Sequence, residues 1–126
     1  MQWVQEGQPI MRHLRNFENQ NNKASIVLCV FIAPIIKEDT YSQFWISVKH
    51  FYDGEPQMII PLDIDQFIEI LETILCVLKK NKSFSHKLLL DLFLKIVSAG
   101  KNLNSFSKWA EEISEIIRDW KKVIMT

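Results

Sequence analysis

Three consecutive pieces of residues 26–67 decide the fold: IVLCVFIAP (26–34), IIKEDTYSQFWISVKHFYDG (35–54) and EPQMIIPLDIDQF (55–67). The first is an unbroken apolar run closed by Pro34, which favours a β-strand covered on both faces. The second has apolar residues at helical spacing and stops at the turn signal Asp53-Gly54. The third opens with a second short strand, residues 57–61. Because a helix separates the two strands, we expect them to be parallel, with a right-handed crossover.

The residues before this unit predict one helix. Pro9 suits its first turn, where no amide hydrogen is needed, and Ile10, Leu14 and Phe17 form a narrow apolar stripe. The polar run at residues 18–22 ends it, and residues 1–6 have no clear period.

The residues after this unit predict three more helices. Asp63 and Gln66 resemble a capping box that starts the first, whose apolar stripe runs to Leu78. Ser83 caps the second, which Gly100 stops. The third covers residues 106–124 and has the most regular apolar stripe in the chain. The first half of the chain is therefore predicted to be α/β and the second half helical.

Length and composition predict one domain or part of one. The chain has 126 residues, of which 48% are hydrophobic, enough to form a core. We divide it into an N-terminal helix (1–25), a strand–helix–strand–helix core (26–78) and two C-terminal helices (79–126). Fifteen basic and fifteen acidic residues cancel, so the strongly basic balance typical of many nucleic-acid binders is absent.

The apolar runs and cysteines indicate a cytoplasmic protein. The longest apolar run, residues 26–33, is far shorter than the roughly 20 residues of a membrane span, so no membrane partner is expected. Cys29 and Cys76 both lie in apolar runs, which favours buried, reduced thiols over a disulfide.

The chain alone contains no motif that specifies a reaction. Its three glycines form no phosphate-binding loop, and its histidines and cysteines lack the spacing of metal ligands. Asp119-Trp120-Lys121 matches the Asp-x-Lys pattern of some nucleases. The helical periodicity of residues 106–124, however, places both charges on a solvated face. Helix capping and an exposed face account for the acidic residues Asp63, Asp65, Glu69 and Glu72.

The central stretch resembles the AlwI-type restriction endonucleases, relatives of the FokI cleavage domain with the PD-(D/E)xK nuclease fold. The resemblance covers roughly residues 6–75. The residues that carry it are Glu6-Gly7-Gln8-Pro9, Arg12-His13, Lys23-Ala24-Ser25, Phe31-Ile32-Ala33-Pro34-x-Ile36, Asp39-Thr40, Phe44-Trp45, Lys49, Tyr52-x-Gly54, Ile59-Ile60-Pro61-Leu62 and Ile64-x-Gln66-Phe67.

The resemblance implies a partial restriction-endonuclease-like sheet followed by a helical segment. In that family the catalytic Asp and the Glu-x-Lys or Asp-x-Lys precede the helix that matches residues 9–20. This chain would then be a C-terminal fragment or subunit of a type II enzyme that cleaves double-stranded DNA with Mg²⁺. It would hold no metal itself and would be inactive alone.

The resemblance also implies candidate site residues. Glu6, Arg12 and His13 are placed at the edge of the active site or at an interface between two nuclease domains, although an exposed helix face explains Arg12 and His13 equally well. The expected partners are a second nuclease chain or a second copy of this chain.

Two other hypotheses stay open. In the first, the chain is a catalytically inert protein-interaction module that retains the nuclease scaffold. In the second, it is an unrelated small α/β domain, and antiparallel or unpaired strands would favour this hypothesis. The apolar strand at 26–33 would have an open edge, which we expect a partner chain, self-association or residues 1–6 to cover.

Overall fold

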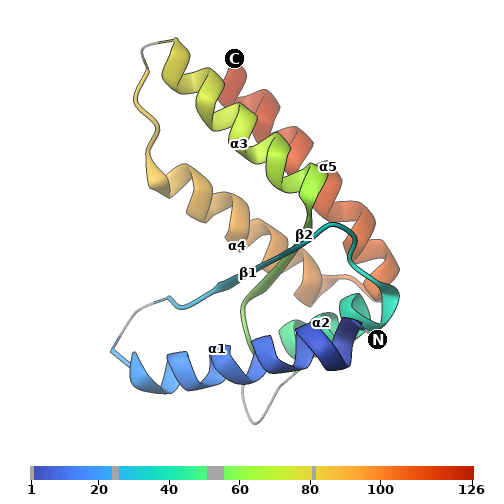
Figure 1. Cartoon of the computed structure of the whole chain (residues 1–126). Helices are drawn as coiled ribbons and strands as arrows, with labels where there is room; N and C mark the ends of the chain where they lie inside the picture. Colours follow the sequence, from blue (N-terminus) through green and yellow to red (C-terminus); the bar gives the residue numbers. More distant parts are fainter. Residues whose placement is uncertain (1, 24–25, 51–55, 81) are drawn as a thin grey trace.

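The structure is a computed structural model that describes residues 2–23, 26–50, 56–80 and 82–126. A π-helical turn and the first helix precede a strand–helix–strand unit, and three helices follow it (Figure 1). In chain order the elements are η1 (Trp3–Gly7), α1 (Gln8–Gln20), β1 (Cys29–Ala33), α2 (Glu38–Lys49), β2 (Ile59–Asp63), α3 (Ile64–Lys79), α4 (His86–Asn102) and α5 (Phe106–Met125).

The two strands pair in parallel, as predicted. Cys29 lies opposite Ile59 and Ala33 opposite Asp63, and the Cys29 N–H donates to the Met58 carbonyl oxygen at 2.9 Å. This pairing confirms the predicted α/β fold class, a small parallel sheet followed by helices. It also removes the strand arrangement that would have favoured an unrelated α/β domain.

The strand bounds differ from the predicted 26–33 and 57–61, and Pro61 lies inside β2 instead of ending it. Since successive residues of a strand turn their amides to alternate sides, the Cys29–Met58 bond fixes which residues face the partner strand. Ile60 and Leu62 face β1, and Pro61 faces away from it. The missing N–H of Pro61 therefore removes no hydrogen bond between the strands.

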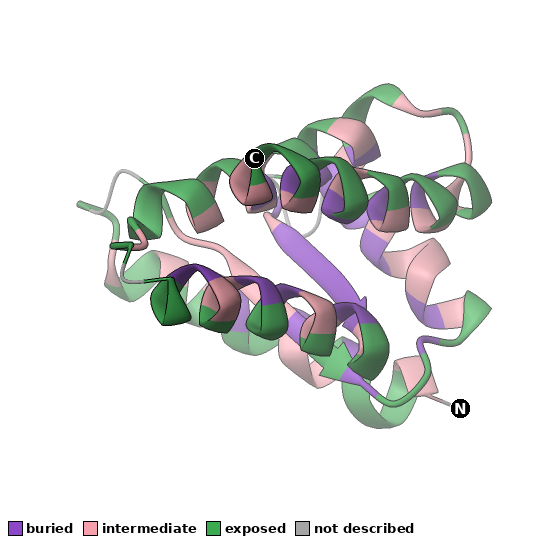
Figure 2. Cartoon of the chain, turned by 90° about the horizontal axis from the view of Figure 1, so that it is seen from above, coloured by how far each residue is buried: buried purple, intermediate pink, exposed green. Residues whose placement is uncertain are grey.

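The prediction that the first strand is covered on both faces is wrong. Ile32 of β1 is 39% exposed, whereas Ile59, Ile60 and Leu62 of β2 are fully buried. Figure 2 shows this contrast between the strands. The apolar run at 26–33 therefore marks a strand whose outer side is left open by the elements that the structure describes.

Helix α2 connects the strands and ends at Lys49, earlier than predicted. The predicted turn at Asp53-Gly54 lies outside the described residues. The Lys49 ammonium donates to the carbonyl oxygens of Lys101 at 2.9 Å and Leu103 at 2.8 Å. This cation satisfies carbonyls at the C-terminal end of α4 and so links the first half of the chain to the second.

The predicted capping box of α3 is confirmed. The Gln66 N–H donates to Asp63 Oδ1, and the Asp63 N–H donates to Gln66 Oε1, both at 2.9 Å. For α4 the predicted cap is wrong, because Ser85 and not Ser83 accepts from the first turn. Helix α5 agrees with the predicted range to within one residue and is capped by Ser105.

Gly100 does not stop α4, which continues to Asn102. A Cβ atom at this position would lie 2.9 Å from the ring of Trp109, a fully buried residue of α5. The indole N–H of Trp109 donates to the Ile96 carbonyl oxygen at 2.9 Å, which fixes the ring. Gly100 is therefore a packing residue that lets α4 and α5 approach each other.

One apolar cluster joins α1, the sheet and all four later helices. On α3, however, much of the predicted stripe is not in this core. The buried residues of α3 are Gln66, Ile70, Thr73 and Val77, and five apolar residues predicted to be inside are exposed. Those five are Ile64, Ile68, Leu71, Leu75 and Leu78. Phe17 and Val123, which belong to the apolar stripes of α1 and α5, are 55% and 74% exposed.

Replacing Gly100 with alanine tests the contact between α4 and α5. At an open helical position this change would stabilise the helix by about 1 kcal/mol. Here the added methyl meets the fixed ring of Trp109, so we expect a net loss of about 1–2 kcal/mol in the free energy of unfolding, measured by urea denaturation. Ser98→Ala, at an exposed position of the same helix, is the control and should change stability by less than about 0.5 kcal/mol. A stabilised Gly100→Ala variant would contradict this packing.

Amide hydrogen exchange tests the open edge of β1. The amides of Phe31 and Ala33 face β2, like that of Cys29, whereas those of Val30 and Ile32 face away from it. In NMR-detected exchange on the isolated chain, we expect Phe31 and Ala33 to be protected and Val30 and Ile32 to exchange quickly. Equal protection of all four amides would show that the edge is covered.

Candidate functional site

The free edge of β1 is the first component of the candidate site. In the described part of the chain, β1 has one hydrogen-bonded neighbour, β2. The N-terminal residues, one of the three predicted covers, are helical and add no strand within the described ranges. Gln2 bonds beyond the end of β1, where its Nε2 donates to the Ile35 carbonyl oxygen and its Oε1 accepts from the Lys37 N–H, both at 2.7 Å.

Two adjoining hollows lie between β1 and helix α1. Figure 1 shows α1 crossing this end of the sheet. One, of about 400 Å³, is lined by Gln5, Glu6, Pro9, Ile10, His13 and residues 31–34. The other, of about 330 Å³, is lined by Ile10, His13, Leu14, Phe17, Leu28 and Cys29 and is mostly apolar. Ile10 and His13 belong to both, so we treat the two hollows together as the edge groove.

The edge groove brings together two of the three predicted site residues. Glu6 of η1 and His13 of α1 both line it. Arg12 is exposed but is not among the lining residues, because adjacent residues of a helix point about 100° apart. Phe17, the last residue of the apolar stripe of α1, lines the apolar end of the groove, which accounts for its exposure.

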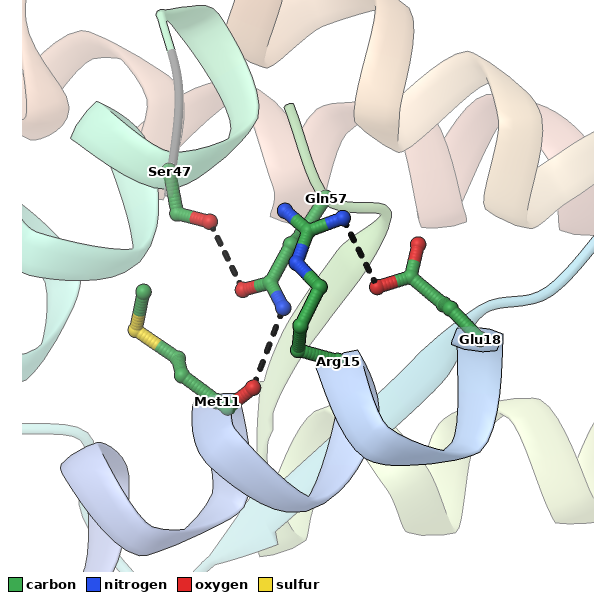
Figure 3. A network of polar contacts seen from close by, with 5 residues as sticks. All are labelled: Met11, Arg15, Glu18, Ser47 and Gln57. Atoms are coloured by element: carbon green, nitrogen blue, oxygen red, sulfur yellow. Dashed lines mark hydrogen bonds and ion pairs between the residues drawn. The ribbon is translucent and has the colours of Figure 1, made fainter. Parts of the chain in front are cut away.

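A buried amide positions α1, and with it the groove (Figure 3). Gln57, just before β2, is fully buried. The Ser47 hydroxyl of α2 donates to Gln57 Oε1 at 2.9 Å, and Gln57 Nε2 donates to the Met11 carbonyl oxygen of α1 at 3.0 Å. Three separate segments are thus joined through one side chain.

An ion pair lies on the same helix. Arg15 is one turn after Met11 in α1, and its guanidinium pairs with Glu18 at 3.4 Å, both side chains being mostly shielded from solvent (Figure 3). No local sequence pattern indicates this arrangement, because the residues around Gln57 predict only the start of a strand.

Burial suppresses acid–base reactivity near the sheet. Burial raises the pKa of the Cys29 thiol, which keeps it protonated and makes it a poor nucleophile at neutral pH. Burial and the nearby Asp63 carboxylate raise the pKa of Tyr41 to about 12. Both cysteines are free thiols, but they are half-buried and not fully buried as predicted.

The residues of the groove do not fit a magnesium site. Glu6 is the one carboxylate among the lining residues, and nowhere in the described ranges do three Asp, Glu, His or Cys side chains gather as metal ligands. In α5, Asp119 is exposed and Trp120 is buried, as the periodicity predicted, but Lys121 is half-buried and not on a fully solvated face. Asp63 is used as the cap of α3. Among the described residues the groove therefore offers one carboxylate, Glu6, and one imidazole, His13, which are too few for a metal-ligand set.

None of the described helices is both long and apolar enough to cross a bilayer.

Comparison with known proteins identifies the family. The family model described as AlwI restriction endonuclease matches residues 1–70, which include η1, α1, both strands and the crossover helix. No curated protein matches the chain. The match spans more than half of the chain and all the residues that line the edge groove. The chain belongs to the AlwI restriction endonuclease family.

Proposed function

We propose that this chain supplies the scaffold part of a nuclease domain that cleaves double-stranded DNA, and that it is inactive alone. Its family gives a restriction-endonuclease type of function, with DNA as the substrate. In our proposal the metal-binding carboxylates and the catalytic lysine belong to strands outside residues 1–126, and these strands bind Mg²⁺ in the complete enzyme.

The observation that carries this proposal is the free edge of β1 beside the edge groove. Val30 and Ile32 turn their backbone groups away from β2, so they present unpaired donors and acceptors to an added strand. The apolar end of the groove, with Phe17, offers a surface on which side chains of that strand would pack. A strand paired here would also lie next to Glu6 and His13.

The position of Arg12 fits a separate role in the same proposal. Arg12 is exposed on α1, the helix that the family resemblance relates to the pairing of two nuclease domains. A guanidinium on that surface can form bidentate contacts with a carboxylate of a second nuclease chain. We therefore propose Arg12 as an interface residue and Glu6 and His13 as residues at the edge of the active site.

The second candidate is an inert interaction module that retains the scaffold. The same free edge favours it, since an exposed strand accepts a strand from any partner that fits the groove. The two candidates differ in one respect: only the first regains DNA cleavage when the catalytic strands are supplied.

A cleavage assay tests the first part of the proposal. The purified chain, incubated with supercoiled plasmid and Mg²⁺, is expected to leave the plasmid intact, because its groove lacks a set of metal ligands. Nicking or linearisation that follows the chain through every purification step, and that EDTA abolishes, would contradict the proposal.

Complementation tests the second part. A polypeptide carrying the catalytic strands of an AlwI-family enzyme should bind the chain and restore Mg²⁺-dependent cleavage. Phe17→Lys removes an exposed apolar residue of the groove, and we expect it to weaken this binding about 10–100-fold, since burying such a side chain is worth about 1.5–3 kcal/mol.

Val123→Lys is the matched control, because it replaces an exposed apolar residue of α5 that does not line the groove. Restored binding without cleavage would favour the interaction module. Equal effects of the two lysine variants would contradict the role of the groove.

A further inference from the structure

Helix α3 has a second apolar face, which points away from the core. Its five exposed residues, Ile64, Ile68, Leu71, Leu75 and Leu78, are between 41% and 55% exposed. They follow one another at intervals of four, three, four and three residues along the whole helix. This spacing is that of the a and d positions of a coiled coil, which places them in a single seam.

The core does not explain this seam. The buried residues of α3, such as Ile70 and Val77, lie on another side of the helix, which contacts α5 and the sheet. Monomeric proteins rarely expose contiguous apolar surface of this kind, and a sustained heptad pattern is typical of a helix that pairs with another helix. In Figure 1, α3 and α1 lie on opposite sides of the sheet, so the seam is separate from the edge groove.

We propose that the seam of α3 pairs with the seam of a second copy of this chain, with the two helices antiparallel. The charges beside the seam argue for this occupant. Asp65 and Glu69 lie in the N-terminal half of α3 and Glu72 lies just past its middle, whereas Lys79 ends the helix and Lys80 and Lys82 follow it. An antiparallel copy places each acidic half against a basic end, whereas a parallel copy places like charges together.

The register follows from the same positions. Asp65 and Lys79 occupy equivalent places, each directly after a seam residue. A two-fold axis near Leu71 brings Asp65 of one copy toward Lys79 of the other, twice in the dimer. The same axis brings Glu72 near its own copy, and this like-charge contact weakens the dimer at neutral pH.

The size of the seam sets the expected affinity. A helix of 16 residues is about 24 Å long, so one helix pair buries less than the roughly 1,600 Å² of a standard stable interface. We therefore expect reversible association in the micromolar range. This association does not depend on whether the edge groove receives a strand.

Sedimentation equilibrium over a concentration series tests the proposal. The unmodified chain should pass from monomer to dimer. Leu71→Glu, at an exposed position in the middle of the seam, should stay monomeric at every concentration, with an unchanged circular dichroism spectrum. Val123→Lys, away from the seam, should dimerise like the unmodified chain. A chain that is monomeric throughout, or a dimer unaffected by Leu71→Glu, would overturn the proposal.

Charge reversal tests the orientation. Asp65→Lys and Lys79→Glu should each weaken the dimer several-fold, and the double variant should recover the original affinity, because both pairs are then restored with reversed sign. Glu72→Gln should tighten the dimer a few-fold by removing the repulsion at the axis. No recovery in the double variant would overturn the antiparallel arrangement.

Discussion

The parallel pairing of β1 with β2 is the constraint on which the rest of the structure depends. Parallel strands cannot be joined by a tight turn, so α2 must cross between them, and its buried face becomes part of the core. Among the described residues the pairing leaves each strand one unpaired edge, and helices α2, α3 and α4 pack on β2, whose side chains are buried, whereas Ile32 of β1 stays exposed. Gln57 then joins α1, α2 and the approach to β2, which sets the position of the helix that forms the other wall of the groove.

Local signals in the sequence predicted the parts of the fold that depend on local chemistry. The capping box at Asp63 and the bounds of α5 were predictable because caps and helical periodicity act within a few residues. Gly100 and Pro61 were misread because their roles depend on contacts distant in sequence. Gly100 makes room for the ring of Trp109, and Pro61 lies at a position where the strand needs no N–H donor.

The site was predictable only through the family resemblance. Glu6 and His13 were named from it and lie in one groove, whereas the groove itself required the structure, because the sequence shows Phe17 and Ile32 only as members of apolar segments. Hydrophobicity alone does not distinguish a residue that is buried within its own chain from one that another strand or helix would cover. The seam of α3 illustrates the same limit, since its apolar residues were all assigned to the core.

The central claim is that β1 accepts a strand from the catalytic part of the nuclease domain. The most direct measurement is NMR-detected amide exchange of the isotope-labelled chain, with and without a polypeptide carrying the catalytic strands of an AlwI-family enzyme. The account predicts that Val30 and Ile32 become protected on binding while the amides of α3 do not change. Binding that leaves Val30 and Ile32 exchanging as fast as before would contradict it.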